Sequence, residues 1–235
     1  YIIRVDIGGD GALTTDPKPP IAAGNNLLSI AANPVAPYLY VPDFSQNQIG
    51  QYRIEGDGSL TQLAGARPAT GYLPIDMAFD PSGTHAYVAN FTNNFVYNAV
   101  GTVSQYTVGS DGVLTPMSPA SVEVAGWPRQ VLVSASGKTA YALFDGGGEY
   151  SNPTASGIDV YAIGPNGALE RKHTYSVGYA RRMAFDPAGK YLYVSTGNAT
   201  VLQYKIGNDD TLVLDSHPVN IGSPMQIIVR KVPGN

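Results

Sequence analysis

Short runs of alternating apolar and polar residues recur along the chain, and each leads into a glycine-containing turn. Four of them are QYRIEGDGSLT from Gln51, QYTVGSDGVLT from Gln105, VYAIGPNGALE from Val160 and QYKIGNDDTLV from Gln203. A more divergent copy, RVDIGGDGALT, begins at Arg4. A period of two is typical of half-buried β-strands. Asp-Gly or Asn-Gly between two such runs predicts a hairpin, because both residues adopt positive φ at low cost.

A second pattern precedes each of the four hairpins. MAFDPSGTHAYVAN from Met77 returns about a hundred residues later as MAFDPAGKYLYVST from Met183. A tyrosine occupies the same place of the pattern in each unit, at Tyr40, Tyr87, Tyr141 and Tyr193. Each unit therefore predicts four antiparallel strands in about 45 to 50 residues, which is the size of one propeller blade. No apolar periodicity of 3.6 residues indicates helices.

The repeat predicts an all-β fold, a β-propeller of four-stranded antiparallel blades with about five blades in a single domain over 1–235. The units are expected at 27–70, 74–124, 128–177 and 181–221, with 1–21 and 224–231 sharing a first blade closed by N- and C-terminal strands. Such closure removes the open edges of the sheet. The first blade lacks its Tyr-Val strand. Sequence missing before Tyr1 is the favoured explanation, a strand donated by another molecule is the second, and a place in a larger propeller is the third.

Composition narrows the classes of partner. The net charge is −4, with 14 Lys and Arg against 18 Asp and Glu, so no basic footprint for nucleic acid or anionic lipid is present. The absence of cysteine excludes disulfides, thiolate metal sites and thiol catalysis. No apolar run approaches the roughly 18 residues that span a bilayer. With few charges and loops rich in asparagine and aromatic residues, we expect a secreted, periplasmic or cell-surface protein.

Aligning the units brings polar residues to the mouth of the central channel, where the innermost strands begin. The ligand-binding set expected there is Asp76, Arg129, Gln130, Arg181, Arg182 and Gln226. Two arginines beside one aspartate can hold a carboxylate or phosphate through paired N–H donors. The alternative, favoured from the sequence alone, is that these polar groups satisfy one another and a few channel waters.

Two insertions, 90–101 and 144–157, fall between the second and third strands of neighbouring units. Long loops on a regular repeat are typical of a binding face. Their aromatic residues are candidates for contact with a protein or carbohydrate ligand: Phe91, Phe95, Tyr97 and Tyr150. Loops without a binding role are the equally weighted alternative.

Metal and cofactor signals are sparse. Asp145 and Glu149 are the candidates for a Ca²⁺ site, although no calcium-loop pattern accompanies them. No other cofactor is expected, and the chain has neither an HExxH motif, nor a G-x-S-x-G elbow, nor a Walker loop. The three histidines, His85, His173 and His217, stand in three different strand contexts.

The phrase FDPSGTHAYVAN followed by VSQYTVGSDGVLTP resembles the YVTN-type repeat of lactonase-like β-propellers, which include 6-phosphogluconolactonase-type and muconate-lactonizing proteins. The resemblance covers nearly the whole chain and is specific for the fold. It implies seven blades, where about five units are found here. It also implies that a Gly-Pro-Arg-His type phrase supplies polar residues for the lactone. The matching phrase is GWPRQ, so Arg129 is kept and Gln130, which cannot exchange a proton near neutral pH, replaces the histidine.

Taken together, the sequence predicts a non-enzymatic, extracytoplasmic binding or structural module. One alternative is a lactone or ester hydrolase at the channel mouth, in which Asp76 activates water while Arg129 or Arg182 stabilises the oxyanion. Another is a repeating subunit of a homopolymeric assembly, in which self-association donates a strand to the incomplete first blade.

Overall fold

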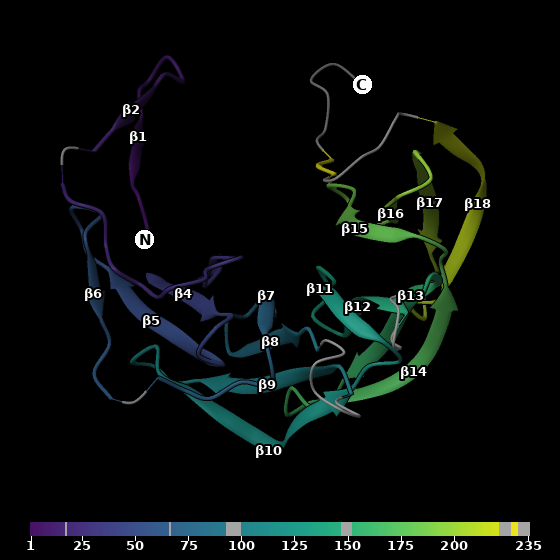
Figure 1. The fold of residues 1–235 in the computed structure, drawn as a ribbon, viewed down its shortest axis with the longest axis horizontal. Helices are drawn as coiled ribbons and strands as arrows, with labels where there is room; N and C mark the ends of the chain where they lie inside the picture. Colours follow the sequence, from purple (N-terminus) through teal and green to yellow (C-terminus); the bar gives the residue numbers. More distant parts are fainter. Residues whose placement is uncertain (17, 66, 93–99, 147–151, 221–226, 230–235) are drawn as a thin grey trace.

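The structure is a computed structural model that describes residues 1–235 except 17, 66, 93–99, 147–151, 221–226 and 230–235. Within the described part, the chain forms β-strands and no helix. Four antiparallel sheets of four strands and one two-stranded hairpin follow one another along the sequence. Figure 1 shows them arranged as blades around a common centre. The prediction of an all-β propeller with four-stranded antiparallel blades is confirmed.

The strands follow the order of the chain within every blade. The hairpin consists of β1 (Val5–Ile7) and β2 (Leu13–Thr15). The four blades are β3 (Ala31–Ala32), β4 (Tyr38–Asp43), β5 (Gln48–Ile54) and β6 (Leu60–Gln62); β7 (Pro74–Phe79), β8 (His85–Asn90), β9 (Thr102–Val108) and β10 (Leu114–Glu123); β11 (Trp127–Val133), β12 (Thr139–Gly146), β13 (Asn152–Ile163) and β14 (Leu169–Ser176); and β15 (Ala180–Phe185), β16 (Tyr191–Thr196), β17 (Thr200–Ile206) and β18 (Leu212–Asn220).

The glycine turns that the sequence marks join the third and fourth strands of each blade. Gly112 and Gly167 both adopt a φ of +81°, in the left-handed region that glycine enters at low cost. The turn before β10 is closed by the Gly112 N–H, which donates to the Gly109 carbonyl at 2.9 Å. These turns fix the register of the outer hairpin of the blade.

The core lies between blades. Side chains from neighbouring sheets interleave in it, for example Tyr141, Leu143, Ile158 and Val160 with Met183, Leu192 and Val194. The repeated tyrosines Tyr40, Tyr87 and Tyr141 are fully buried in this layer. Each hydroxyl needs a partner there, and each donates to a turn carbonyl of the next blade, at Gly112, Gly167 and Asp210 respectively. The sequence repeat is thus also a repeat of contacts between blades.

The hairpin of β1 and β2 and the blade of β15 to β18 lie at the two ends of an open arc in Figure 1. β1 pairs with β2, and Ile2 forms an isolated bridge with Ile21. Most of 224–231, the segment expected to complete the first blade, is outside the described residues, and 227–229 are not in a strand. Among the described residues, no pairing joins the hairpin to the C-terminal segment, so a closed first blade stays a prediction.

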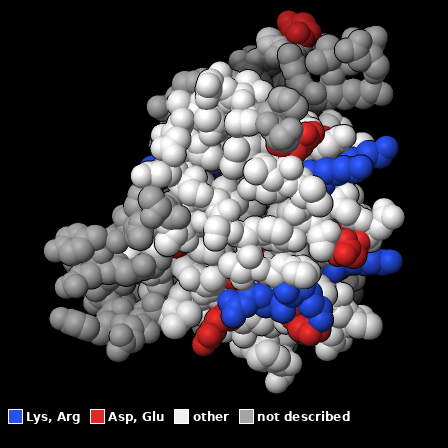
Figure 2. Space-filling view, turned by 90° about the vertical axis from the view of Figure 1, so that its right-hand side faces the viewer, with Lys and Arg blue, Asp and Glu red and all other residues white. Residues whose placement is uncertain are grey.

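Charge is dispersed over the described part of the face shown in Figure 2. On the face in Figure 2, Lys and Arg are interspersed with Asp and Glu on a largely uncharged surface. This agrees with the absence of a basic footprint in the composition. Within the described part of the chain, no helix long and apolar enough to cross a membrane is found.

Candidate functional site

The innermost strands of three blades line a polar pocket of about 390 Å³. Its lining is formed by Leu28, Ser29, Ile75, Asp76, Arg129, Gln130, Arg182, Met183 and Ile227. The pocket therefore gathers four of the six residues that the aligned repeat brings to the channel mouth. These four come from β7, β11 and β15, which begin side by side around the channel (Figure 1).

A β-bulge opens each of these three strands. The register shifts between Pro74 and Asp76, between Pro128 and Gln130, and between Ala180 and Arg182. One extra residue stands at each shift, at positions 75, 129 and 181. A bulge bends its strand and redirects side chains. Two consecutive side chains of one strand can therefore face the channel mouth.

In β7 and β11, the residue after the extra position links one blade to the next. Asp76 Oδ2 accepts the N–H of Val131 at 3.0 Å. Gln130 accepts the N–H of Met183 at 2.7 Å and donates to the Met183 carbonyl at 3.2 Å. Both ends of the Gln130 amide are therefore occupied. Gln130 is a connection between blades, and the proton-accepting group of the pocket has to be sought elsewhere.

Asp76 is the titratable group with the environment of a base. Burial raises the pKa of its carboxyl group to about 6, against the opposing effects of the Val131 N–H, the positive charge of Arg182 and the Met77 N–H. Desolvation disfavours the charged form of a carboxyl group. A carboxylate with a pKa near 6 is ionised at neutral pH and is still able to accept a proton, which is the compromise that general base catalysis needs.

Arg129 is held on two sides. Its Nε donates to Asp145 Oδ2 at 2.6 Å, and its Nη2 contacts the same oxygen. Its Cζ lies 4.7 Å from the centroid of the Phe91 ring, in a cation–π arrangement. Phe91 in turn meets Trp127 edge to face, with ring centroids 5.6 Å apart.

The two neighbouring arginines of β15 differ in position. Arg182 lines the pocket, and its Nη1 donates to the carbonyl of Arg181 at 3.3 Å. No ion pair of Arg182 is found within the described residues, so its charge faces the pocket without a carboxylate in contact. Arg181 is exposed, and its guanidinium packs over Gly197, outside the pocket lining.

Several predicted site residues lie outside the described residues: Gln226, Phe95, Tyr97, Tyr150 and Glu149. The protein or carbohydrate ligand expected on the long-loop face therefore stays a prediction. The structure places Phe91 and Asp145 against Arg129, where Asp145 is an ion-pair partner. In the described ranges, no group of three or more His, Asp or Glu side chains gathers as a metal site.

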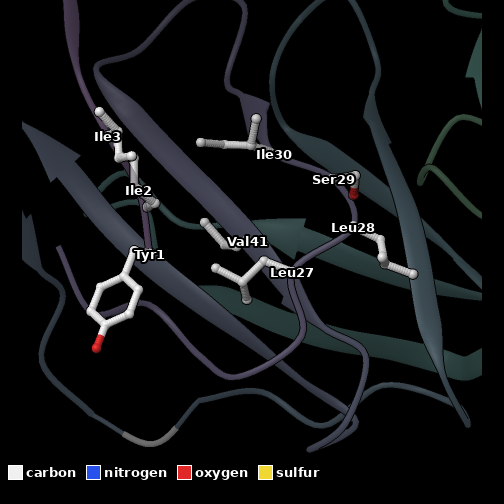
Figure 3. Close-up of a pocket in the computed structure, with 8 residues that line it drawn as sticks. All are labelled: Tyr1, Ile2, Ile3, Leu27, Leu28, Ser29, Ile30 and Val41. Carbon is white, nitrogen blue, oxygen red and sulfur yellow. The ribbon is translucent and has the colours of Figure 1, made fainter. Parts of the chain in front are cut away.

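An apolar pocket of about 300 Å³ lies beside the polar one (Figure 3). The two share Leu28 and Ser29, and the rest of the second lining is Tyr1, Ile2, Ile3, Leu27, Ile30 and Val41. Hydrocarbon side chains dominate this lining. It offers neither the carboxylate nor the guanidinium groups of the first pocket, so the polar pocket is the candidate site for chemistry.

Sequence reasoning missed Trp127 and the pairing of Arg129 with Asp145. The available signal was positional, because Trp127 and Asp145 are register partners at the start of β11 and the end of β12. Asp145 is therefore placed across from the bulge that contains Arg129, and this placement indicates an ion pair between the two side chains.

The family comparison matches the chain to a family of β-propellers. The model described as "Lactonase, 7-bladed beta-propeller" matches residues 14–229. No curated protein sequence matches the chain. The model match covers most of the chain and overturns the interpretation as a non-enzymatic binding or structural module. Physically, that interpretation assumed that the channel residues neutralise one another, whereas Arg182 has no carboxylate in contact among the described residues and Asp76 has a raised pKa.

Solved structures agree on the fold. A putative 6-phosphogluconolactonase from Bacteroides uniformis has a TM-score of 0.75 at 19% identity, covering 94% of this chain and 66% of that one. A putative 6-phosphogluconolactonase from Bacteroides fragilis has a TM-score of 0.72 at 21% identity, covering 95% and 65%. The periplasmic gluconolactonase of Pseudomonas aeruginosa has a TM-score of 0.75 at 18% identity, covering 95% and 64%. The chain thus spans about two thirds of the length of these proteins. With its family model matched over 14–229, the chain belongs to the lactonase family of seven-bladed β-propellers.

Proposed function

We propose that the chain hydrolyses a lactone in the polar pocket between β7, β11 and β15. The observation that carries the proposal is the meeting of Asp76, whose pKa is raised to about 6, with the guanidinium groups of Arg129 and Arg182 in one pocket. A base and N–H donors that stabilise an oxyanion are groups that promote the addition of water to an ester carbonyl. The family match supports the reaction class.

In the proposed mechanism, the Asp76 carboxylate accepts a proton from a water molecule as its oxygen attacks the lactone carbonyl carbon. Negative charge develops on the carbonyl oxygen, and the N–H groups of Arg129 and Arg182 stabilise it. The bond between the carbonyl carbon and the ring oxygen then breaks. The proton held by Asp76 passes to the leaving ring oxygen, which becomes a hydroxyl group, so one water is consumed and an open-chain hydroxy acid is released.

A sugar lactone is the proposed substrate class. Its support is the description of two neighbours as putative 6-phosphogluconolactonases and of a third as a gluconolactonase. A polar ring with several hydroxyl groups also suits a pocket whose side chains offer N–H donors and oxygen acceptors. Arginine binds phosphate through paired N–H groups, so glucono-δ-lactone and its 6-phosphate form the first pair of substrates to compare.

The proposed location is outside the cytoplasm. Its support is the Pseudomonas aeruginosa neighbour, which is described as periplasmic. Fractionation of the source cells, with an antibody against the chain, tests this proposal, and a signal in the cytoplasmic fraction alone would contradict it.

The test of the activity is acid release from glucono-δ-lactone and its 6-phosphate in a pH-stat, with the spontaneous rate subtracted. We expect Asp76→Asn to lower turnover by about 10²- to 10⁴-fold, the usual contribution of a general base. Asp6→Asn is the matched control, because Asp6 is an exposed carboxylate on β1. A folded wild-type chain without turnover on either substrate, or an Asp76→Asn variant as active as the wild type, would contradict the proposal.

A further inference from the structure

We propose that Asp145 and Phe91 are positioning residues that fix the guanidinium of Arg129 for the substrate carbonyl oxygen. The inference rests on the proposed function, because it assigns the residues that make one of its two cations effective. Neither side chain needs to touch the substrate. Both act through Arg129.

Among the described residues, the contacts of Arg129 leave part of its guanidinium without a partner. Asp145 engages Nε and Nη2 from one edge, and Phe91 covers one face of the planar group. A guanidinium carries five N–H donors in a rigid plane. The donors that Asp145 does not use are therefore held in a fixed direction, and Arg129 is part of the pocket lining.

The partners of Arg129 are themselves fixed. The Asp145 side chain is 6% exposed, against 33% for the Arg129 side chain, so the carboxylate is the buried member of the pair. The backbone of Asp145 is the register partner of Trp127 across β11 and β12. Trp127 packs edge to face against Phe91, and the Phe91 ring in turn contacts the guanidinium of Arg129. The four residues form a closed ring of contacts, which limits the orientations available to the guanidinium.

The next blade supplies an internal comparison. Arg181 is the extra residue of the β15 bulge, as Arg129 is of the β11 bulge. Pro128 pairs with Phe144 and Ala180 pairs with Thr196, so the residues that follow, Asp145 and Gly197, correspond to each other. Where glycine replaces aspartate, the arginine lies over that glycine and stays outside the pocket lining. Of the two arginines at equivalent bulge positions, only Arg129, which is held by a carboxylate, lines the pocket.

The test is a double-mutant cycle on kcat/KM for sugar-lactone hydrolysis with wild type, Asp145→Asn, Arg129→Ala and the double variant. We expect Asp145→Asn to lower kcat/KM by about 10²-fold, the effect of misplacing a reacting group by about 1 Å. We expect no further loss when Asp145→Asn is added to Arg129→Ala, because the first residue acts through the second. Asp145→Glu keeps the charge and should recover part of the loss.

Asp43→Asn is the matched control. Asp43 is a buried carboxylate at the end of β4, where it accepts backbone N–H groups of Ser45 and Gln46 rather than an arginine. It should leave kcat/KM unchanged. Equal losses from Asp145→Asn in the presence and absence of Arg129, or full activity in Asp145→Asn, would overturn the proposal.

A second readout separates this inference from the proposed function. Trp127 is the one tryptophan of the chain, so its emission spectrum reports on the ring of contacts without any substrate. We expect Asp145→Asn and Arg129→Ala to shift that emission, with the double variant matching Arg129→Ala and Asp43→Asn matching wild type. If the wild type hydrolyses no lactone, the proposed function fails while this experiment still decides the geometry. A Trp127 emission unaffected by Asp145→Asn would overturn the inference by itself.

Discussion

The hydroxyl group of Tyr87 donates a 2.7 Å hydrogen bond to the carbonyl of Gly167, the glycine in the hairpin turn of the next blade. Tyr40 and Gly112 form the same contact at 2.6 Å. The tyrosine and the turn glycine are the two features that recur in the sequence. They recur together because in three successive blades the tyrosine holds the turn of the blade that follows.

Removal of one such hydroxyl should weaken the contact between two blades. Tyr87 is fully buried, so in Tyr87→Phe the ring still fills its space but the Gly167 carbonyl loses its donor. We expect a loss of about 1–3 kcal/mol in the free energy of unfolding, the cost of an unsatisfied buried group, measured by urea denaturation. Tyr193→Phe is the control at the same repeat position, since no hydrogen bond of the Tyr193 hydroxyl is found among the described residues. Equal losses in the two variants would contradict this account.

The turn glycines should differ in their tolerance of a side chain. Gly167 and Gly11 have almost the same φ, +81° and +82°, so alanine incurs a similar backbone strain at both, about 1–2 kcal/mol. A Cβ at Gly167 would also collide with the ring of His85, whereas nothing lies within 4 Å of one at Gly11. We expect Gly167→Ala to cost about 1–3 kcal/mol more than Gly11→Ala because of this overpacking. Thermal or urea unfolding of the two variants measures the difference, and similar costs would contradict it.

The fold was accessible from the sequence because blades repeat and repeats can be aligned. The same alignment brought Asp76, Arg129, Gln130 and Arg182 to one channel mouth, and the structure places all four in one pocket. It could not separate Arg182 from Arg181, because both residues stand at the bulge of β15 and only the contact of Arg181 with Gly197 distinguishes them. Alignment identifies the strand position, and the contacts of each side chain determine whether it lines the pocket.

The chemistry of the pocket was harder to predict. Asp76 belongs to no catalytic motif, and its suitability as a base comes from burial, which a repeat alignment does not show. The sequence indicates Asp145 only as a candidate Ca²⁺ ligand, because its partner Arg129 is 16 residues away on the neighbouring strand. The prediction of a non-enzymatic module was wrong for this reason: it relied on missing motifs, and here the candidate groups are assembled by packing between blades.

The two arginines of β15 should differ in their effect on hydrolysis. Arg182 lines the pocket and its charge acts on the Asp76 carboxyl group, whereas Arg181 is exposed beside Gly197. We expect Arg182→Ala to lower kcat by about 10²- to 10³-fold, the usual effect of losing one oxyanion donor, and Arg181→Ala to leave it within about threefold of wild type. Steady-state kinetics on the better of the two sugar lactones measures both. Equal losses of kcat in Arg182→Ala and Arg181→Ala would contradict the assignment of Arg182, and not Arg181, to the pocket.

The pH dependence of hydrolysis should carry the signature of Asp76. Its carboxyl group must be ionised to accept a proton from water, and its pKa is raised to about 6. We therefore expect kcat/KM to rise with pH and to level off above about pH 6, as the free enzyme loses this proton. Arg182→Ala removes a positive charge that favours the carboxylate, so the midpoint of the residual activity should move to higher pH. A profile flat between pH 4.5 and 7.5 would exclude Asp76 as the base.

The same carboxyl group should make the protein less stable where it is most active. In the unfolded chain its pKa is near the ordinary value of 3.8, and in the folded chain it is about 6. Between these values the folded state binds more protons than the unfolded state, so the free energy of unfolding falls as pH rises from about 4 to 6 and then levels off. In Asp76→Asn this penalty is absent, while the amide oxygen can still accept the Val131 N–H.

We therefore expect Asp76→Asn to be much less active yet more stable than wild type by about 1–3 kcal/mol at pH 7, since each pKa unit corresponds to about 1.4 kcal/mol. The gain should shrink toward zero as the pH falls to 4, because both proteins are then neutral at this position. Urea denaturation at pH 4, 5.5 and 7 measures the difference, with Asp6→Asn as the control for an exposed carboxylate. A gain that does not depend on pH, or a loss at pH 7, would mean that Asp76 is held for structure, since a carboxylate kept for catalysis is the one whose removal stabilises the fold.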